Sequence, residues 1–163
     1  MKSLFAALTP CVLAFALAGP ANAQNQSEIV GTWKFVSHSL TEVPTGKVSK
    51  YYGEKPKGYI SYSKGGHIVF VLFDERRQKP ATPFKDEDKV KLFDSLSAGS
   101  GTYKVEGNQL IITYDTSWLE LWTDTTQSRT FEVKDKKLTI TSAPSKNANG
   151  IDIVFTLVLE KVE

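Results

Sequence analysis

The chain has 163 residues, with 20 basic and 18 acidic side chains, two histidines and a single cysteine. This near balance of charge gives no electrostatic reason to expect nucleic acid or an anionic membrane as a partner. His38 and His67 lie outside any HExxH or EF-hand spacing, and one cysteine adds too few ligands for a metal site, so we predict neither a metal nor another cofactor.

The first 23 residues have the pattern of a cleaved secretory signal peptide. Lys2 is followed by an apolar run from Leu4 to Leu17 and then by AGPANAQ, which places a small-x-small cleavage site after Ala23. The apolar run is too short to span a bilayer stably, so we expect no membrane span. We expect a single secreted or periplasmic domain at residues 24–163, which has no cysteine and relies on its apolar core.

Strand signals dominate the rest of the chain, beginning with EIVGTWKFVS at residues 28–37. In this segment Gly31 stands two positions before Trp33. We expect the first strand to start near Ile29.

A hairpin is predicted at residues 58–73, GYISYSKGGHIVFVLF, with its turn near residues 64–66. With a two-residue loop, His67 would share a face with Tyr62, and these two side chains could together move a proton. The alternative is a solvent-exposed His67 at the start of the second strand, beside the glycine turn.

One helix is predicted, within KDEDKVKLFDSLS at residues 85–97, where the apolar side chains have approximate helical spacing. It is short and follows a loop that contains Pro80 and Pro83. We expect it to be a lid or plug for an all-β body.

Two further hairpins and a closing strand follow. Residues 102–114 alternate around Gly107-Asn108, residues 129–141 alternate around Asp135-Lys136, and the last strand is predicted within residues 150–163. The side chains predicted to face the core are Tyr103, Val105, Leu110, Ile112, Tyr114, Phe131, Val133, Leu138, Ile140, Ile151, Ile153, Phe155, Leu157 and Leu159. Because closure removes exposed sheet edges, the pattern predicts an all-β antiparallel up-and-down barrel of about 8–10 strands with one short helix.

Arg129 is a polar residue at a position that should face inward, because it has the same parity as Phe131 and Val133. It either extends its guanidinium to the mouth of the barrel or stands in the cavity as a fixed cation for a ligand carboxylate or carbonyl. A buried, unpaired arginine is costly, so the second interpretation also needs a partner, with Glu120 or Asp115 as candidates.

The segment TSWLELWTD, residues 116–124, holds two tryptophans. Trp118, Glu120 and Trp122 alternate, so an extended chain would place them on one side. There the indoles would bind a flat apolar ligand, fill the core or form a belt at the rim of the barrel.

Gly31-Thr32-Trp33 on the first strand of a secreted barrel resembles the Gly-x-Trp of lipocalins. In lipocalins this tryptophan crosses the closed end of the barrel, and the glycine lets the chain bend there. The resemblance therefore implies that Gly31 and Trp33 are structural and that Trp33 is the floor of a cup.

A longer resemblance covers Ile29 to Val162. GTWKFVS, GYISYSKGGHIVFVLF, SGTYKV, SW and QSRTFEVKDKKLTIT look like successive blocks of the bacterial and fungal lipocalin-like domain family, whose shape is related to allene oxide cyclase barrels. Two departures separate the chain from true lipocalins. Thr123-Asp124 is followed by threonine instead of an aromatic residue, and the final strand offers Lys161 where lipocalins have an arginine over the floor tryptophan.

Our first hypothesis is a secreted or periplasmic protein that holds a small, largely apolar or amphipathic molecule in its barrel, in an apolar cavity with a few placed polar groups. Arg129 would be the polar anchor. The wall would be formed by Trp118, Trp122, Tyr103, Tyr114, Phe131 and Phe155.

The alternative is a cofactor-free isomerase, cyclase or lyase that acts on a small organic substrate in the same cavity. Arg129 would stabilise an oxyanion, and His67, Tyr62 or Glu120 would move a proton. A third possibility is an envelope or inhibitor protein with a filled barrel that uses its outer surface. No GxSxG elbow or phosphate loop occurs, which disfavours a simple hydrolase, and the sequence leaves the ligand and the oligomeric state open.

Overall fold

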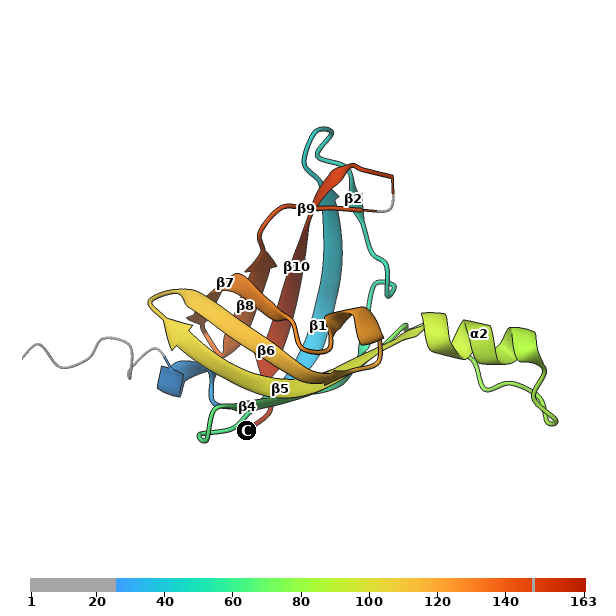
Figure 1. The fold of residues 1–163 in the computed structure, drawn as a ribbon, viewed down its shortest axis with the longest axis horizontal. Coiled ribbons are helices and arrows are strands. Elements are labelled where there is room, and N and C mark those ends of the chain that lie inside the picture. The colour runs from blue at the N-terminus through green and yellow to red at the C-terminus, as the bar shows by residue number, and fades with distance from the viewer. Residues whose placement is uncertain (1–25, 148) are drawn as a thin grey trace, which may run out of the picture.

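The computed structural model describes residues 26–147 and 149–163 (Figure 1). The predicted signal peptide and its cleavage site after Ala23 lie outside the described residues. Within those residues, no helix is long and apolar enough to cross a membrane.

The described chain forms an antiparallel sheet that closes into a barrel (Figure 1). Its strands are β1 (Gly31–Glu42), β2 (Val48–Ser49), β3 (Lys57–Tyr62), β4 (His67–Phe73), β5 (Leu96–Glu106), β6 (Gln109–Ser117), β7 (Thr126–Lys134), β8 (Lys137–Ser142), β9 (Ser145–Lys146) and β10 (Asp152–Lys161). The order around the sheet is β2-β1-β3-β4-β5-β6-β7-β8-β10-β9, and β1 also pairs with β10. Eight strands therefore close the barrel, and β2 and β9 extend it at one end. The predicted all-β, up-and-down class is confirmed.

Two hairpins have the register that their turn residues predict. In β5–β6, Glu106 pairs with Gln109 across Gly107-Asn108, and in β7–β8, Lys134 pairs with Lys137 across Asp135-Lys136. Asp135 and Lys136 have φ angles of 51° and 61°, as in the turn type whose twist matches a two-residue hairpin. The apolar faces of both hairpins consequently point into the barrel.

The β3–β4 hairpin differs from its two-residue prediction. Tyr62 pairs with Ile68, and Ser63 bonds to His67 across a loop of three residues, 64–66. Because side chains alternate along a strand, the extra loop residue reverses the parity of β4 relative to β3. Tyr62 therefore points inward with Ile68, whereas His67 points outward and is exposed, so the prediction that the two share a face is wrong.

One end of the barrel is closed around Trp33. Its side chain is fully buried, its indole Nε1 donates to the Ile29 carbonyl at 2.7 Å, and the Lys161 Nζ lies 5.3 Å from its ring centroid. Gly31 has φ +130°, and a Cβ there would lie 2.4 Å from the carbonyl oxygen of Glu163. Glycine is therefore required where the first strand passes the end of the chain.

Helix α2 (Asp86–Asp94) leaves the barrel between β4 and β5 and projects from its side (Figure 1). None of its residues is buried, and Val90 and Phe93 are 58% and 50% exposed. The expectation of a lid or plug is wrong. Strands β4 and β5 stay paired as far as Phe73 and Leu96, so the segment that holds the helix starts beyond the edge of the sheet.

Candidate ligand-binding site

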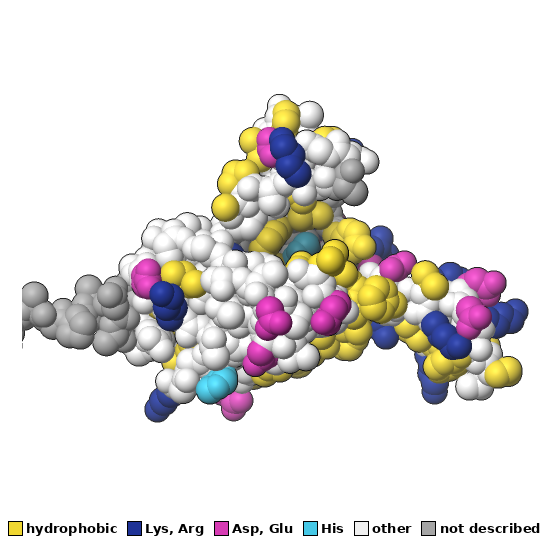
Figure 2. All heavy atoms as spheres, in the orientation of Figure 1, with side chains coloured by type: hydrophobic (Ala, Val, Ile, Leu, Met, Phe, Trp, Pro, Cys, Tyr) yellow, Lys and Arg dark blue, Asp and Glu magenta, His cyan; other side chains and the backbone are white. Residues whose placement is uncertain are grey.

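A cavity of about 280 Å³ lies inside the barrel. Figure 2 shows its opening, where hydrophobic side chains surround a histidine at the base of the hollow. The lining residues are Phe35, His38, Leu40, Tyr51, Tyr52, Ile60, Phe70, Leu72, Ser97, Tyr114, Trp122, Gln127, Arg129, Phe155 and Leu157. The wall is mostly apolar and aromatic, with a few polar groups, as in small-molecule sites generally.

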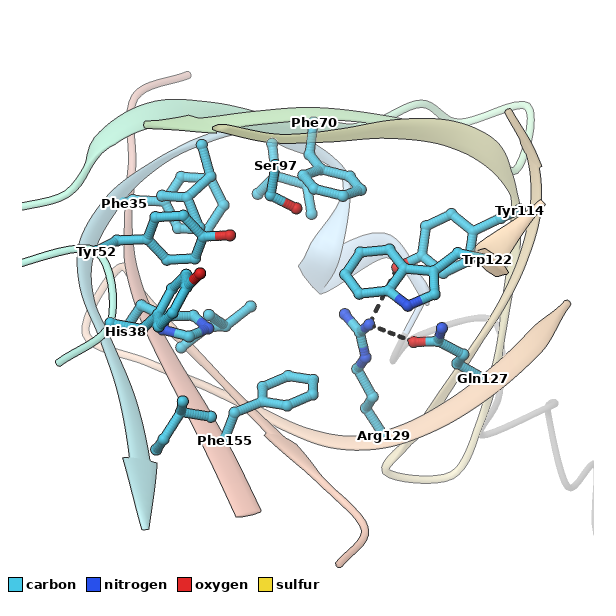
Figure 3. A pocket seen from close by; sticks show the side chains of 15 residues that line it. Phe35, His38, Tyr52, Phe70, Ser97, Tyr114, Trp122, Gln127, Arg129 and Phe155 are labelled. Atoms are coloured by element: carbon cyan, nitrogen blue, oxygen red, sulfur yellow. Dashed lines mark hydrogen bonds between the residues drawn. The ribbon is translucent and has the colours of Figure 1, made fainter. Parts of the chain in front are cut away.

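Arg129 is the charged residue of this lining. It points inward from β7 with the same parity as Phe131, and it is 8% exposed. Its Nη2 donates to the Tyr114 hydroxyl at 3.1 Å and to Gln127 Oε1 at 2.6 Å (Figure 3). Its Cζ lies 4.8 Å from the centroid of the Phe155 ring. The guanidinium is therefore held in place by two neutral acceptors and an aromatic face.

No acidic side chain among the described residues pairs with Arg129 or lines the cavity. The two predicted partners lie elsewhere. Asp115 is exposed and accepts from Ser100 and Thr116, and Glu120 is exposed and accepts from Thr123. The prediction of an acidic partner is wrong, because the inward neighbours on β6 and β7 are Tyr114 and Gln127. The cavity thus carries an uncompensated positive charge.

His38 forms a second polar group, on the other side of the cavity from Arg129 (Figure 3). Its ring centroid lies 5.1 Å from that of Tyr52 and 6.1 Å from that of Phe155. Burial lowers the pKa of His38 from 6.5 to about 4, with a smaller lowering from the charge of Arg129, against a hydrogen bond to its own backbone. The imidazole is therefore neutral at neutral pH, and its buried Nδ1 has no partner on any other described residue.

Comparison with known families gives a match over nearly the whole chain. The model of the lipocalin-like domain matches residues 30–162. The chain belongs to the lipocalin-like domain family. The resemblance seen in the sequence is confirmed.

Two other comparisons add little to this. No match to the chain was found among curated proteins. Among solved structures, the chain is similar to an uncharacterized protein from Bacteroides eggerthii, with 19% identity, a TM-score of 0.39, and coverage of 82% of this chain and 98% of that chain.

His38 was missed by sequence reasoning because this lipocalin-like domain has a β-bulge in its first strand. The β1–β10 register shifts between Phe35 and Ser37, so Val36 has no partner on β10. Strict alternation from Trp33 and Phe35 would point His38 outward, but the extra residue reverses the parity and points it inward. The sequence carries one signal for the inward position of His38. Polar Ser37 and Ser39 flank it, and a strand that points both serines outward points His38 inward.

The predicted aromatic wall of the lipocalin-like cavity is only partly assembled. Trp122, Tyr114 and Phe155 line the cavity, whereas Tyr103 and Phe131 are buried in the core and do not line it. Trp118 also lies outside the lining.

The two tryptophans are separated by a local change of structure. Residues Glu120–Trp122 form the short 3-10 helix η1, so the extended chain predicted to align Trp118, Glu120 and Trp122 is wrong. Trp118 instead contacts Phe93 of α2 at 4.7 Å between ring centroids. Trp122 alone of the three packs toward Tyr114 and the cavity, at 5.9 Å between ring centroids.

The other candidate proton-transfer residues do not meet in the cavity. Tyr62 is buried beside Tyr103, with 5.0 Å between the ring centroids, and burial raises the pKa of its phenol. His67 lies outside on β4, and Glu120 is exposed. In residues 26–147 and 149–163, no three His, Cys, Asp or Glu side chains form a cluster that could hold a metal.

Proposed function

We propose that this lipocalin-like domain binds a small, largely apolar molecule in its barrel cavity, with Arg129 as the polar anchor. The observation that carries the proposal is an apolar, aromatic cavity that holds a buried guanidinium without an acidic partner. A protein interior rarely keeps such a charge, because an unpaired buried ion is costly.

The wall and the anchor have separate roles in this proposal. Apolar contact contributes about 0.8 kcal/mol for each buried methylene of a ligand, without fixing its orientation. Arg129 supplies orientation, because Tyr114 and Gln127 hold its guanidinium before the ligand arrives. A preformed anchor lowers the ordering cost of binding.

A neutral apolar fluorophore, N-phenylnaphthylamine, tests whether the cavity is accessible. We expect saturable fluorescence enhancement with the native protein. Ser97→Phe should lower the affinity by about tenfold or more, because Ser97 is 3% exposed and lines the cavity, so the larger side chain fills it. Ser128→Phe is the control, because Ser128 is exposed on the outer face of β7.

Circular dichroism of each variant verifies that it is folded. Absence of binding by the native protein, or equal binding by folded Ser97→Phe, would contradict the proposal.

Catalysis of proton transfer in the same cavity is less well supported. His38 is the imidazole there, and its pKa of about 4 makes it a weak base. A general base works best with a pKa near the working pH, and a deficit of about three units corresponds to about 4 kcal/mol of lost driving force. We therefore propose binding in preference to a cofactor-free isomerase, cyclase or lyase.

We also propose that the domain works outside the cytoplasm, in the periplasm or the medium. The support is the charged start, apolar run and small-x-small site of residues 1–23. Expression of the full chain in a bacterium, followed by fractionation and mass measurement, tests this. A periplasmic or secreted product beginning at Gln24 is expected, and a cytoplasmic product that retains Met1 would contradict it.

A further inference from the structure

The polar groups of the cavity fall into two sets on opposite sides (Figure 3). We name them the arginine side, formed by Arg129, Tyr114 and Gln127, and the histidine side, formed by His38, Tyr52 and Ser97. Aromatic and aliphatic side chains separate them. The cavity therefore presents polar atoms at two ends and apolar surface between.

The arginine side has free donor capacity. Both hydrogen bonds of the guanidinium to described residues come from Nη2, which leaves Nη1 and Nε without a described acceptor. The two known acceptors are neutral, so the charge is also uncompensated. A planar guanidinium recognises a carboxylate through two parallel hydrogen bonds. A carboxylate would therefore accept from the free donors and also neutralise the charge.

The histidine side has hydrogen-bonding capacity without charge. A neutral imidazole has one donor and one acceptor nitrogen, and the Nδ1 of His38 has no partner on any other described residue. Tyr52 is 7% exposed and directs its hydroxyl oxygen toward the cavity in Figure 3. Burial raises the pKa of this phenol, against a hydrogen bond from Ser97, so Tyr52 is also neutral. A hydroxyl, which donates and accepts, suits this side better than a second anion.

The distance between the two sides limits the length of the ligand. The Phe155 ring centroid lies 6.1 Å from that of His38, nearly parallel to it at 14°, and 4.8 Å from the Cζ of Arg129. Together these distances set the upper limit on the separation of imidazole and guanidinium. That limit excludes an extended ligand and admits a compact one, with the ring of Phe155 close to both sides.

We infer that the ligand is a compact, planar carboxylic acid with a hydroxyl at the end opposite the carboxylate, such as a hydroxyaromatic acid. Its carboxylate binds Arg129, its ring packs near Phe155 and its hydroxyl is directed toward the histidine side. This inference rests on the proposed function and names the class of molecule that the same cavity takes.

Three probes of nearly equal shape test it by isothermal titration calorimetry. They are para-hydroxybenzoate, benzoate, which lacks the hydroxyl, and para-hydroxybenzamide, which lacks the charge. We expect para-hydroxybenzoate to bind about tenfold or more tightly than the amide and several-fold more tightly than benzoate. Equal affinity for the acid and the amide would overturn the inference.

Variants assign each preference to its side of the cavity. Arg129→Gln should abolish the preference for acid over amide and keep the preference for the hydroxyl. His38→Phe should abolish the preference for the hydroxyl and keep the preference for acid over amide. Lys137→Gln, which removes an exposed charge on β8, and His67→Phe, which removes the exposed histidine, are matched controls that should change neither. An unchanged charge preference in folded Arg129→Gln would overturn the assignment.

A measurement on the native protein makes the test independent of variant folding. Arg129 contributes to the low pKa of His38, so a carboxylate beside Arg129 should raise that pKa. NMR titration of the His38 ring with para-hydroxybenzoate, and with the amide as control, detects this. A pKa that does not rise with saturating acid would overturn the inference.

The inference and the proposed function fail in different ways. If N-phenylnaphthylamine binds in the cavity and the acid shows no advantage, the cavity binds apolar molecules and the ligand class is wrong. If neither the fluorophore nor any of the three probes binds, both are wrong.

Discussion

At the scale of single residues, the tryptophan at the closed end and the polar residues of the cavity have different consequences. Trp33 is wholly buried and bonded to the Ile29 carbonyl, and it does not line the cavity. Trp122 lines the cavity and is only partly buried. Stability should therefore depend mainly on Trp33, and binding on Trp122.

Trp33→Ala should lower the free energy of unfolding by about 3–5 kcal/mol, the usual cost of truncating a large buried aromatic side chain. Trp122→Ala should cost less and weaken the binding of N-phenylnaphthylamine. Denaturant melts of both variants, with the fluorophore titration, measure the two effects. A loss of less than about 1 kcal/mol for Trp33→Ala would show that Trp33 does not support the closed end.

His38 predicts a pH dependence of stability. The pKa of His38 is about 4 in the folded state and has its ordinary value of 6.5 in the unfolded chain, so the unfolded chain binds the proton first as the pH falls. The contribution of the neutral His38 imidazole to the free energy of unfolding is fully present above about pH 6.5. It falls by about 3 kcal/mol as the pH drops from there to about pH 4.

The change His38→Phe isolates this effect. Urea melts between pH 7 and pH 4 should show a shallower loss of stability in His38→Phe than in the native protein or in His67→Phe. Equal slopes in all three would mean that the imidazole of His38 is not held neutral by burial.

At the scale of elements, the outcome of sequence reasoning depended on loop lengths and bulges. Gly107-Asn108 and Asp135-Lys136 admit one two-residue loop each, so the faces of β5 to β8, and Arg129 with them, were predicted correctly. Lys64-Gly65-Gly66 fits loops of two or three residues, and the unanticipated third residue reversed the parity of β4.

The bulge at Val36 had the same effect on β1, and it is the reason why His38 was missed. Alternation is a local signal, whereas a bulge is set by the pairing of β1 with β10, more than 100 residues away. Arg129 and Tyr114 were therefore predictable from the sequence, whereas Gln127 and the whole histidine side were not.

The β7–β8 turn offers a test at this scale. Lys136 has φ 61°, a conformation that is strained for a residue with a side chain and unstrained for glycine. Lys136→Gly should raise the free energy of unfolding by about 0.5–1 kcal/mol, while Lys137→Gly, inside β8, should lower it by a similar amount. Denaturant melts decide, and a destabilised Lys136→Gly would contradict the turn geometry.

At the scale of the whole molecule, barrel closure creates the cavity. β1 pairs with both β3 and β10, so residues from the first and last strands of the barrel meet in one wall. His38 comes from the first strand and Phe155 from the last, and Arg129 reaches them from β7. The family match covers this entire barrel, which is why the fold is better defined than the ligand.

Native mass spectrometry of the purified protein tests most directly whether the barrel holds a small molecule. We predict a retained adduct whose mass is lost on mild activation, present in the native protein and in Ser128→Phe and absent from folded Ser97→Phe, in which the cavity is filled. A native protein that carries no adduct and takes up none on incubation with N-phenylnaphthylamine or para-hydroxybenzoate would contradict this account.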